Sequence, residues 1–162
     1  MELDYLSNKN KTFRLKEITF SCSVHSTEDL KKVKTAILHL IPENLRENAE
    51  TESTKMTGHA GNPIHLLELT VSKKKILNDV LAHLAKKMEE FDKEFLYRTL
   101  DNRISKDNLL YFRVNKQDAF NEVLRIENED NAIRVIIKFI VYKSEPNQIR
   151  NALEEYGIIK KG

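Results

Sequence analysis

Apolar and polar residues follow two periods along this chain, and these periods predict its strands and helices. Ile18, Phe20, Cys22 and Val24 alternate with polar residues, which indicates a strand with one buried face. Further strands are predicted over residues 54–57, 64–72, 110–115 and 133–141. Because the last of these is the longest and most apolar, we expect it at the centre of the sheet.

Helical spacing of apolar residues recurs in three segments of the chain. The first covers residues 30–40 and follows a capping box at Ser26–Asp29. The second is one long helix, whose apolar stripe begins at residue 76 and continues to residue 104. The third begins near Pro146 and stops at Gly157, because glycine readily adopts the backbone conformation that ends a helix.

The order of these elements is strand, helix, hairpin, long helix, strands and helix. This order predicts an α+β fold with one mainly antiparallel sheet and helices packed on one face. Residues 1–12 lack a sustained period and are predicted to form a flexible N-terminal arm. Residues 13–162 are predicted to form a single domain, which is long enough to bury a core without disulfides.

The charged residues are nearly balanced, with 27 Lys and Arg against 25 Asp and Glu, so the formal charge is only +2. This balance does not by itself indicate a nucleic-acid-binding protein. A role in RNA binding therefore requires that cationic side chains gather on one side of the folded chain. No apolar run is long enough to span a bilayer, so we expect a cytoplasmic protein without membrane contact.

Residues that could carry catalysis or hold a metal show no recognised spacing. The five histidines lack a metal-ligand pattern, and no motif for a nucleotide phosphate or an activated nucleophile is present. The single cysteine, Cys22, occupies a core position and can form neither an internal disulfide nor a multi-cysteine metal site. We therefore expect no enzyme activity, no cofactor and no metal.

The loop Gly58–Pro63 precedes the strand over residues 64–72 and contains two of the four glycines of the chain. Glycine is placed where the backbone must adopt a positive φ or where another chain segment comes close. Pro63 favours an extended conformation at Asn62, which suits entry into a strand. The loop is either a simple hairpin turn or a ligand-facing loop that carries His59 and Asn62.

Three consecutive lysines, Lys73, Lys74 and Lys75, open the second predicted helix. The helix dipole favours acidic residues at this position, so the lysines are unusual there. Together with the free N–H groups of a helix N-terminus they would form a cradle for a phosphate. The alternative is that the three ammonium groups simply point into water.

A second candidate group lies at the end of the strand over residues 110–115. Tyr111 and Arg113 share the polar face of this strand, and Lys116 and Gln117 follow it directly. An aromatic ring beside a guanidinium group can stack on a base and bind a phosphate. Such residues also occur on sheet surfaces that bind no ligand.

Three segments carry a family resemblance: Thr27-Glu28-Asp29 after the first strand, Gly58–Ile64, and Leu110–Ala119 with Arg103 before it. Over residues 18–156 the chain resembles the archaeal family of predicted RNA-binding proteins that is often labelled exosome-subunit-like. The resemblance implies an α+β fold like that of a double-stranded-RNA-binding domain or a ribosomal protein, and it implies a role in RNA binding.

We therefore predict a non-catalytic protein that recognises the backbone and shape of structured or double-stranded RNA, in RNA processing or degradation. Its cations would neutralise phosphates, and its polar side chains would supply hydrogen bonds. The residues predicted to contact RNA are Lys73, Lys74, Lys75, Arg113, Lys116, His59, Asn62, Gln117 and Tyr111. The alternative is a protein-interaction subunit that forms a homodimer or joins an RNA-processing complex through an exposed edge strand.

Overall fold

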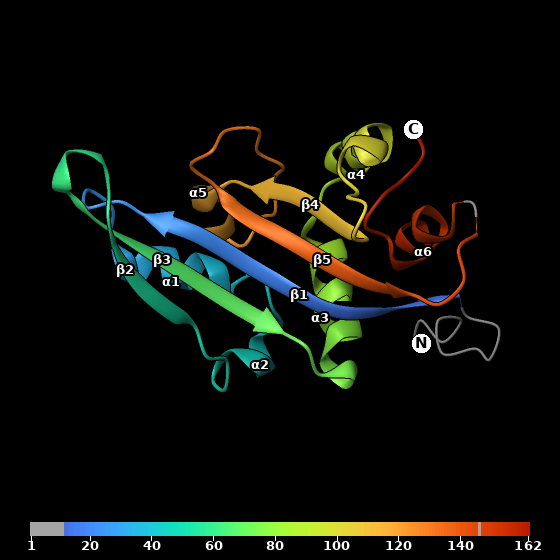
Figure 1. Ribbon diagram of the computed structural model, residues 1–162, viewed down its shortest axis with the longest axis horizontal. Helices are drawn as coiled ribbons and strands as arrows, with labels where there is room; N and C mark the ends of the chain where they lie inside the picture. The colour runs from blue at the N-terminus through green and yellow to red at the C-terminus, as the bar shows by residue number, and fades with distance from the viewer. Residues whose placement is uncertain (1–11, 146) are drawn as a thin grey trace.

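Five antiparallel strands form one sheet in the order β2-β3-β1-β5-β4 (Figure 1). The computed structural model describes residues 12–145 and 147–162, so the predicted arm up to residue 11 and Pro146 lie outside the described residues. The strands are β1 (Phe13–Val24), β2 (Glu52–Thr57), β3 (Pro63–Val71), β4 (Leu109–Val114) and β5 (Ile133–Val141). The prediction of an antiparallel sheet in an α+β fold is confirmed.

Helices cover one face of this sheet. The α-helices are α1 (Leu30–Leu38), α2 (Glu43–Arg46), α3 (Lys74–Lys87), α4 (Glu90–Thr99), α5 (Lys116–Phe120) and α6 (Gln148–Tyr156), and short 3-10 turns are η2 (His59–Gly61) and η3 (Leu100–Asn102). Figure 1 shows α1 and α3 behind the strands, with the open face of the sheet toward the viewer. Within the described ranges, no helix is long and apolar enough to cross a membrane.

The inward face of β1 lies in the middle of the core. Ile18 and Phe20 are fully buried, and burying side chains of this size contributes roughly 1.5–3 kcal/mol each. The pairing of β1 with β5 shifts by one residue at Lys16, which is a β-bulge. Because of this shift, Phe13 and Leu15 also point into the core, and the strand begins earlier than the alternation from Ile18 indicates.

Strand β1 is both the longest strand and the central strand of the sheet. It has 12 residues, whereas β5 has 9 and lies between β1 and β4. The prediction that residues 133–141 form the longest, central strand is therefore wrong. The reason is that the bulge at Lys16 hides the first part of β1 from a simple alternating pattern.

The predicted long second helix is interrupted at Met88. This residue is extended, with φ −81° and ψ 140°, and its backbone forms a parallel bridge with Leu124. The buried Met88 side chain anchors the interruption, and α4 starts in a new direction at Glu90. Phe91 is consequently 68% exposed instead of lying on the buried stripe. The prediction of one helix over residues 76–104 is wrong, because a tertiary contact overrides local helix preference.

The glycine loop joins β2 to β3 as a hairpin, and its two glycines meet different needs. Gly61 has φ +78°, a left-handed conformation that favours glycine. Gly58 has an ordinary φ of −83°, but a Cβ atom there would lie 2.4 Å from Cδ1 of Ile64. The prediction of a hairpin at this loop is confirmed by the pairing of Thr57 with Pro63.

Replacing the buried Phe20 by alanine tests which face of the sheet forms the core. The Phe20→Ala variant is expected to lose about 3–5 kcal/mol of unfolding free energy, because the substitution leaves a cavity. The control is Ser21→Ala on the opposite face of β1, which should change this free energy by less than about 0.5 kcal/mol. Urea unfolding followed by circular dichroism measures both, and equal losses would contradict the assignment of the faces.

Candidate nucleic-acid interface

The structure distributes the predicted RNA-contacting residues over three places. The backbone of His59 and Asn62 belongs to the β2–β3 hairpin loop, and Lys73, Lys74 and Lys75 stand where β3 leads into α3. The remaining residues lie on β4, which carries Tyr111 and Arg113, and at the start of α5, which carries Lys116 and Gln117. Two strands, β1 and β5, separate β3 from β4 (Figure 1), so the lysines that follow β3 and Arg113 on β4 belong to different parts of the sheet. The predicted cations therefore do not form one continuous cluster, and their role in RNA binding stays a prediction.

The three lysines at the start of α3 are exposed and share their surroundings with acidic residues. Lys73 lines a hollow of about 560 Å³ whose rim also carries Glu50, Glu52 and Glu68. The neighbouring carboxylates reduce the positive potential at Lys73, because fixed charges of opposite sign that lie close together partly cancel each other's field. This end of α3 is therefore a mixed-charge surface.

Lys116 is held inside the protein by several oxygen atoms. Its Nζ donates hydrogen bonds to the Ser23 carbonyl at 2.7 Å, to Asn131 Oδ1 at 2.7 Å and to Glu28 Oε1 at 3.0 Å. Only 11% of the Lys116 side chain and 23% of the Glu28 side chain are exposed. This cation joins β1, α5 and the loop before β5, and its charge is already neutralised.

The pKa of the Glu28 carboxyl group reflects both its burial and its ion pair with Lys116. Burial alone would raise the pKa of its carboxyl group, but the hydrogen bond from the His25 amide and the ammonium group of Lys116 outweigh burial. The pKa of Glu28 is therefore lowered, and the carboxylate stays charged at neutral pH.

Arginine side chains meet on the open face of the sheet at β4 and β5. Arg113 and Arg134 are direct partners in the β4–β5 register, about 5 Å apart at their Cα atoms. Tyr111 is the partner of Ile136 one step along the same face, and its amide donates to the Arg103 carbonyl at 2.9 Å. These elements enclose a groove of about 370 Å³, lined by Asn102, Arg103, Tyr111, Phe112, Arg113 and Arg134.

The positive charge of this groove is only partly compensated. Arg113 contacts the Asn128 carbonyl at 3.0 Å and the fully exposed Asp130 at 3.4 Å. Arg134 is exposed and forms no ion pair among the residues that the structure describes. Burial, and then the charge of Arg113, lowers the pKa of Arg103, whose Nε donates to Thr99 Oγ1 at 2.7 Å. We call Tyr111 and the three arginines the arginine groove.

Arg103 and Arg134 were not among the predicted RNA-contacting residues, and the sequence pattern differs between them. Arg134 occupies an outward position in the alternation of β5. The sequence pattern could therefore have placed its side chain on the open face of the sheet, together with Ile136. Arg103 follows η3 in an irregular segment that pairs with the outer edge of β4, where no periodic pattern indicates its direction.

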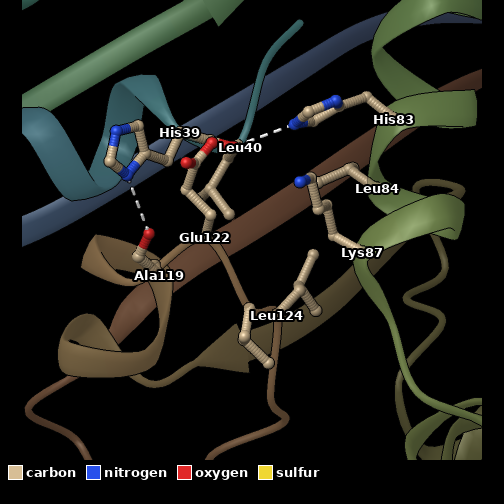
Figure 2. A pocket seen from close by; sticks show the side chains of 9 residues that line it. His39, Leu40, His83, Leu84, Lys87, Ala119, Glu122 and Leu124 are labelled. Atoms are coloured by element: carbon tan, nitrogen blue, oxygen red, sulfur yellow. Dashed lines mark hydrogen bonds between the residues drawn. The ribbon is translucent and has the colours of Figure 1, made fainter.

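Two of the histidines line one small space between α1, α3 and α5, and Figure 2 shows that each ring points toward a backbone carbonyl. Nε2 of His83 donates to the His39 carbonyl at 2.9 Å, and Nδ1 of His39 donates to the Ala119 carbonyl at 3.2 Å. Burial lowers the pKa of His83, so its ring is neutral at pH 7. The space between these side chains is too small for a water molecule. The His83 ring thus links α3 to the end of α1, and the His39 ring links the end of α1 to α5.

Metal-ligating side chains do not cluster in the part of the chain that the structure describes. Within residues 12–145 and 147–162, no group of three or more His, Cys, Asp and Glu residues is arranged to hold a metal ion. The thiol of Cys22 is buried, and burial raises its pKa to about 11, so it is protonated at neutral pH.

Comparison with known proteins assigns the chain to a family. A family model described as RNA binding matches residues 17–139, which is more than half of the chain. The chain belongs to this family. It is 32% identical over 131 residues to the uncharacterized protein MJ0213 of Methanocaldococcus jannaschii, covering 79% of this chain and 87% of the relative. It is 24% identical over 134 residues to the RNA-binding protein PAB1135 of Pyrococcus abyssi, covering 82% and 87%.

Solved structures of similar proteins share the fold. The protein AF2318 of Archaeglobus fulgidus superimposes with a TM-score of 0.76 at 29% identity, over 88% of this chain and 99% of that chain. Mth689 of Methanothermobacter thermautotrophicus gives a TM-score of 0.68 at 23% identity, over 90% and 98%. The chain therefore spans nearly the whole of both proteins, and the family membership predicted from the resemblance to RNA-binding proteins is confirmed.

Removing the Lys116 ammonium group tests whether this residue stabilises the fold. Lys116→Met keeps the length of the side chain but leaves Glu28 without its partner, so we expect a loss of about 2 kcal/mol of unfolding free energy. The loss is smaller than for a fully buried pair, because Glu28 can still reach water. Lys74→Met, at an exposed position, is the control and should be nearly neutral in urea unfolding. Equal stability of the two variants would contradict the stabilising role of Lys116.

The lowered pKa of Glu28 predicts a particular pH dependence of stability. A carboxyl group whose pKa is lower in the folded state stabilises that state above its unfolded pKa, about 4.3, and loses this contribution as the pH falls through the folded value. The difference in unfolding free energy between the wild type and Glu28→Gln should therefore be constant near pH 7. It should shrink as the pH falls below about 4.3, the pKa of an unfolded glutamate. Thermal unfolding measured across this range checks it, and a difference that grows in acid would refute it.

Proposed function

We propose that this protein is a non-catalytic RNA-binding protein that holds phosphate groups in the arginine groove. The observation that carries the proposal is the direct cross-strand pairing of Arg113 with Arg134 on the open face, beside Arg103. Like charges placed directly opposite each other destabilise a sheet. An anionic ligand between them turns this cost into a favourable interaction.

Arginine is the side chain best suited to such a ligand. Its planar guanidinium group binds phosphate oxygens through two parallel hydrogen bonds, and it remains charged even when partly buried. Membership in a family described as RNA binding, and the name of the Pyrococcus abyssi relative, support RNA as the source of the phosphates.

The proposed site keeps Tyr111 and Arg113 from the sequence prediction and adds Arg103 and Arg134. Lys116 is left out because Glu28 neutralises it, and Gln117 lines a separate hollow beside α1. Lys73, Lys74 and Lys75 are left out because they lie outside the groove, where Lys73 shares a hollow with Glu50, Glu52 and Glu68. His59 and Asn62 belong to a hairpin loop on the β2–β3 side of the sheet, away from the groove.

We further propose that the RNA is structured and that the protein acts in an RNA-processing or RNA-degrading assembly, as the sequence resemblance implies. The surface for a protein partner is β2, an edge strand whose six residues are all exposed. An exposed edge can pair with a strand from another chain. This feature also supports the second candidate function, a self-associating or protein-binding subunit.

Salt titration of RNA affinity tests the proposed function. A fluorescein-labelled hairpin RNA with an unpaired loop should bind at low salt, and its affinity should fall steeply between about 50 and 200 mM salt as counterions are released. Arg134→Gln should weaken binding and reduce the slope of log affinity against log salt by about one. Arg14→Gln is the matched control on β1, opposite Ile140 at the other end of the same face, and should leave the slope unchanged.

Absence of RNA affinity at low ionic strength, in a protein shown to be folded by circular dichroism, would overturn the proposed function. Sedimentation of the RNA-free protein addresses the second candidate, since a dimer that persists at high dilution would favour self-association through β2.

A further inference from the structure

We infer that the arginine groove binds an unpaired nucleotide, with its base stacked on Tyr111 and its phosphates held by the surrounding arginines. The inference rests on the proposed function and specifies which part of an RNA the protein recognises. It implies that single-stranded segments, such as loops and ends, are bound in preference to continuous duplex.

The position of Tyr111 supports stacking. Its side chain is partly exposed on the open face, opposite Ile136, and its backbone amide donates to the Arg103 carbonyl on the outer side of β4. Arg113 is two residues further along the strand on the same face, about 7 Å away. A ring with a guanidinium group two residues along the same face can hold a base while an adjoining phosphate reaches the cation.

Only an unpaired base can use such a ring. In a duplex both faces of each base are occupied by neighbouring base pairs, so sequence- or stacking-based recognition of RNA takes place at unstacked nucleotides. The amide of Asn102 lines the same groove and has both a donor and an acceptor for the edge of a base.

Acidic residues on the same face limit how far RNA can extend. The row that contains Arg113 and Arg134 continues through Ser21 of β1 to Glu68 of β3 and Glu52 of β2. Glu52 and Glu68 are themselves direct cross-strand partners, so two carboxylates stand side by side at the far edge of the sheet.

The acidic pair Glu52 and Glu68 lies close enough to the arginine pair for salt to screen their interaction only in part. Glu68 and Arg134 are separated by two strand spacings, about 10 Å, which is close to a Debye length of about 8–10 Å at physiological salt. Phosphates that lie over β1 and β3 are therefore repelled. Domains that bind duplex RNA by shape contact a length of about 16 base pairs, which needs cations spread over a wide surface. In the row that contains Arg113 and Arg134, the cations occupy only β4 and β5.

Affinity for an RNA strand and for its blunt duplex, both fluorescein-labelled, tests the inference by fluorescence anisotropy at one low salt concentration. The wild type should bind the single strand about tenfold or more tightly than the duplex. Tyr111→Leu should weaken binding of the single strand about tenfold, which is within the range measured for loss of one stacked base. Tyr111→Phe keeps the ring and should bind like the wild type.

Tyr142→Leu is the matched control. Tyr142 is 58% exposed and directly follows β5, about 20 Å along the strand from Ile136, where its hydroxyl group accepts a hydrogen bond from Arg14. This substitution should leave RNA affinity unchanged. Thermal unfolding of all variants checks that a loss of affinity does not come from a loss of fold.

A second readout depends on stacking alone. An RNA strand that contains 2-aminopurine should lose fluorescence when it binds the wild type or Tyr111→Phe, because stacking on an aromatic ring quenches this base, and it should lose less when bound at saturation to Tyr111→Leu. Equal affinity for strand and duplex, or wild-type affinity in Tyr111→Leu, would overturn the inference while leaving the proposed function intact. Failure of the wild type to bind either RNA would instead overturn the proposed function itself.

Discussion

Burial of one face of the sheet beneath α1 and α3 is the constraint on which the rest of this structure depends. Side chains alternate along a strand, so each residue that enters the core places its neighbour on the open face. Burial of Phe112 between Tyr111 and Arg113, and of Val135 beside Arg134, therefore turns these three side chains outward. The groove is a geometric consequence of core packing.

The cations of this chain have two different roles, which depend on where the nearest carboxylate lies. Lys116 is enclosed by Glu28 and backbone oxygen, so its charge stabilises the contact between β1 and α5. Arg113 and Arg134 face each other at a cost in stability. Sequences tend to break such local rules at functional sites, which is the basis of the proposal made above for this groove. A net charge of +2 conceals this difference, because the acidic pair Glu52 and Glu68 stands on the same face as the arginine pair.

Much of the fold follows from short-range patterns in the sequence. Alternation identified the buried faces of the strands, and the helix stop at Gly157 is confirmed by its φ of +84°. The α1 cap is close to the predicted box, with Asp29 accepting hydrogen bonds from the Lys31 and Lys32 amides. The errors occurred where a distant segment intervened. Met88 leaves the helix to pair with Leu124, and the bulge at Lys16 depends on the register with β5.

The candidate site shows the same division. The sequence alone determined that Tyr111 and Arg113 share the wet face of one strand, because a period of two residues is a local property of the chain. Only the tertiary structure decided that Arg134 stands opposite Arg113, that the Arg103 backbone pairs with Tyr111, and that Glu28 neutralises Lys116. These contacts join residues far apart in the chain, and their register depends on how the whole core packs. No local pattern records that packing.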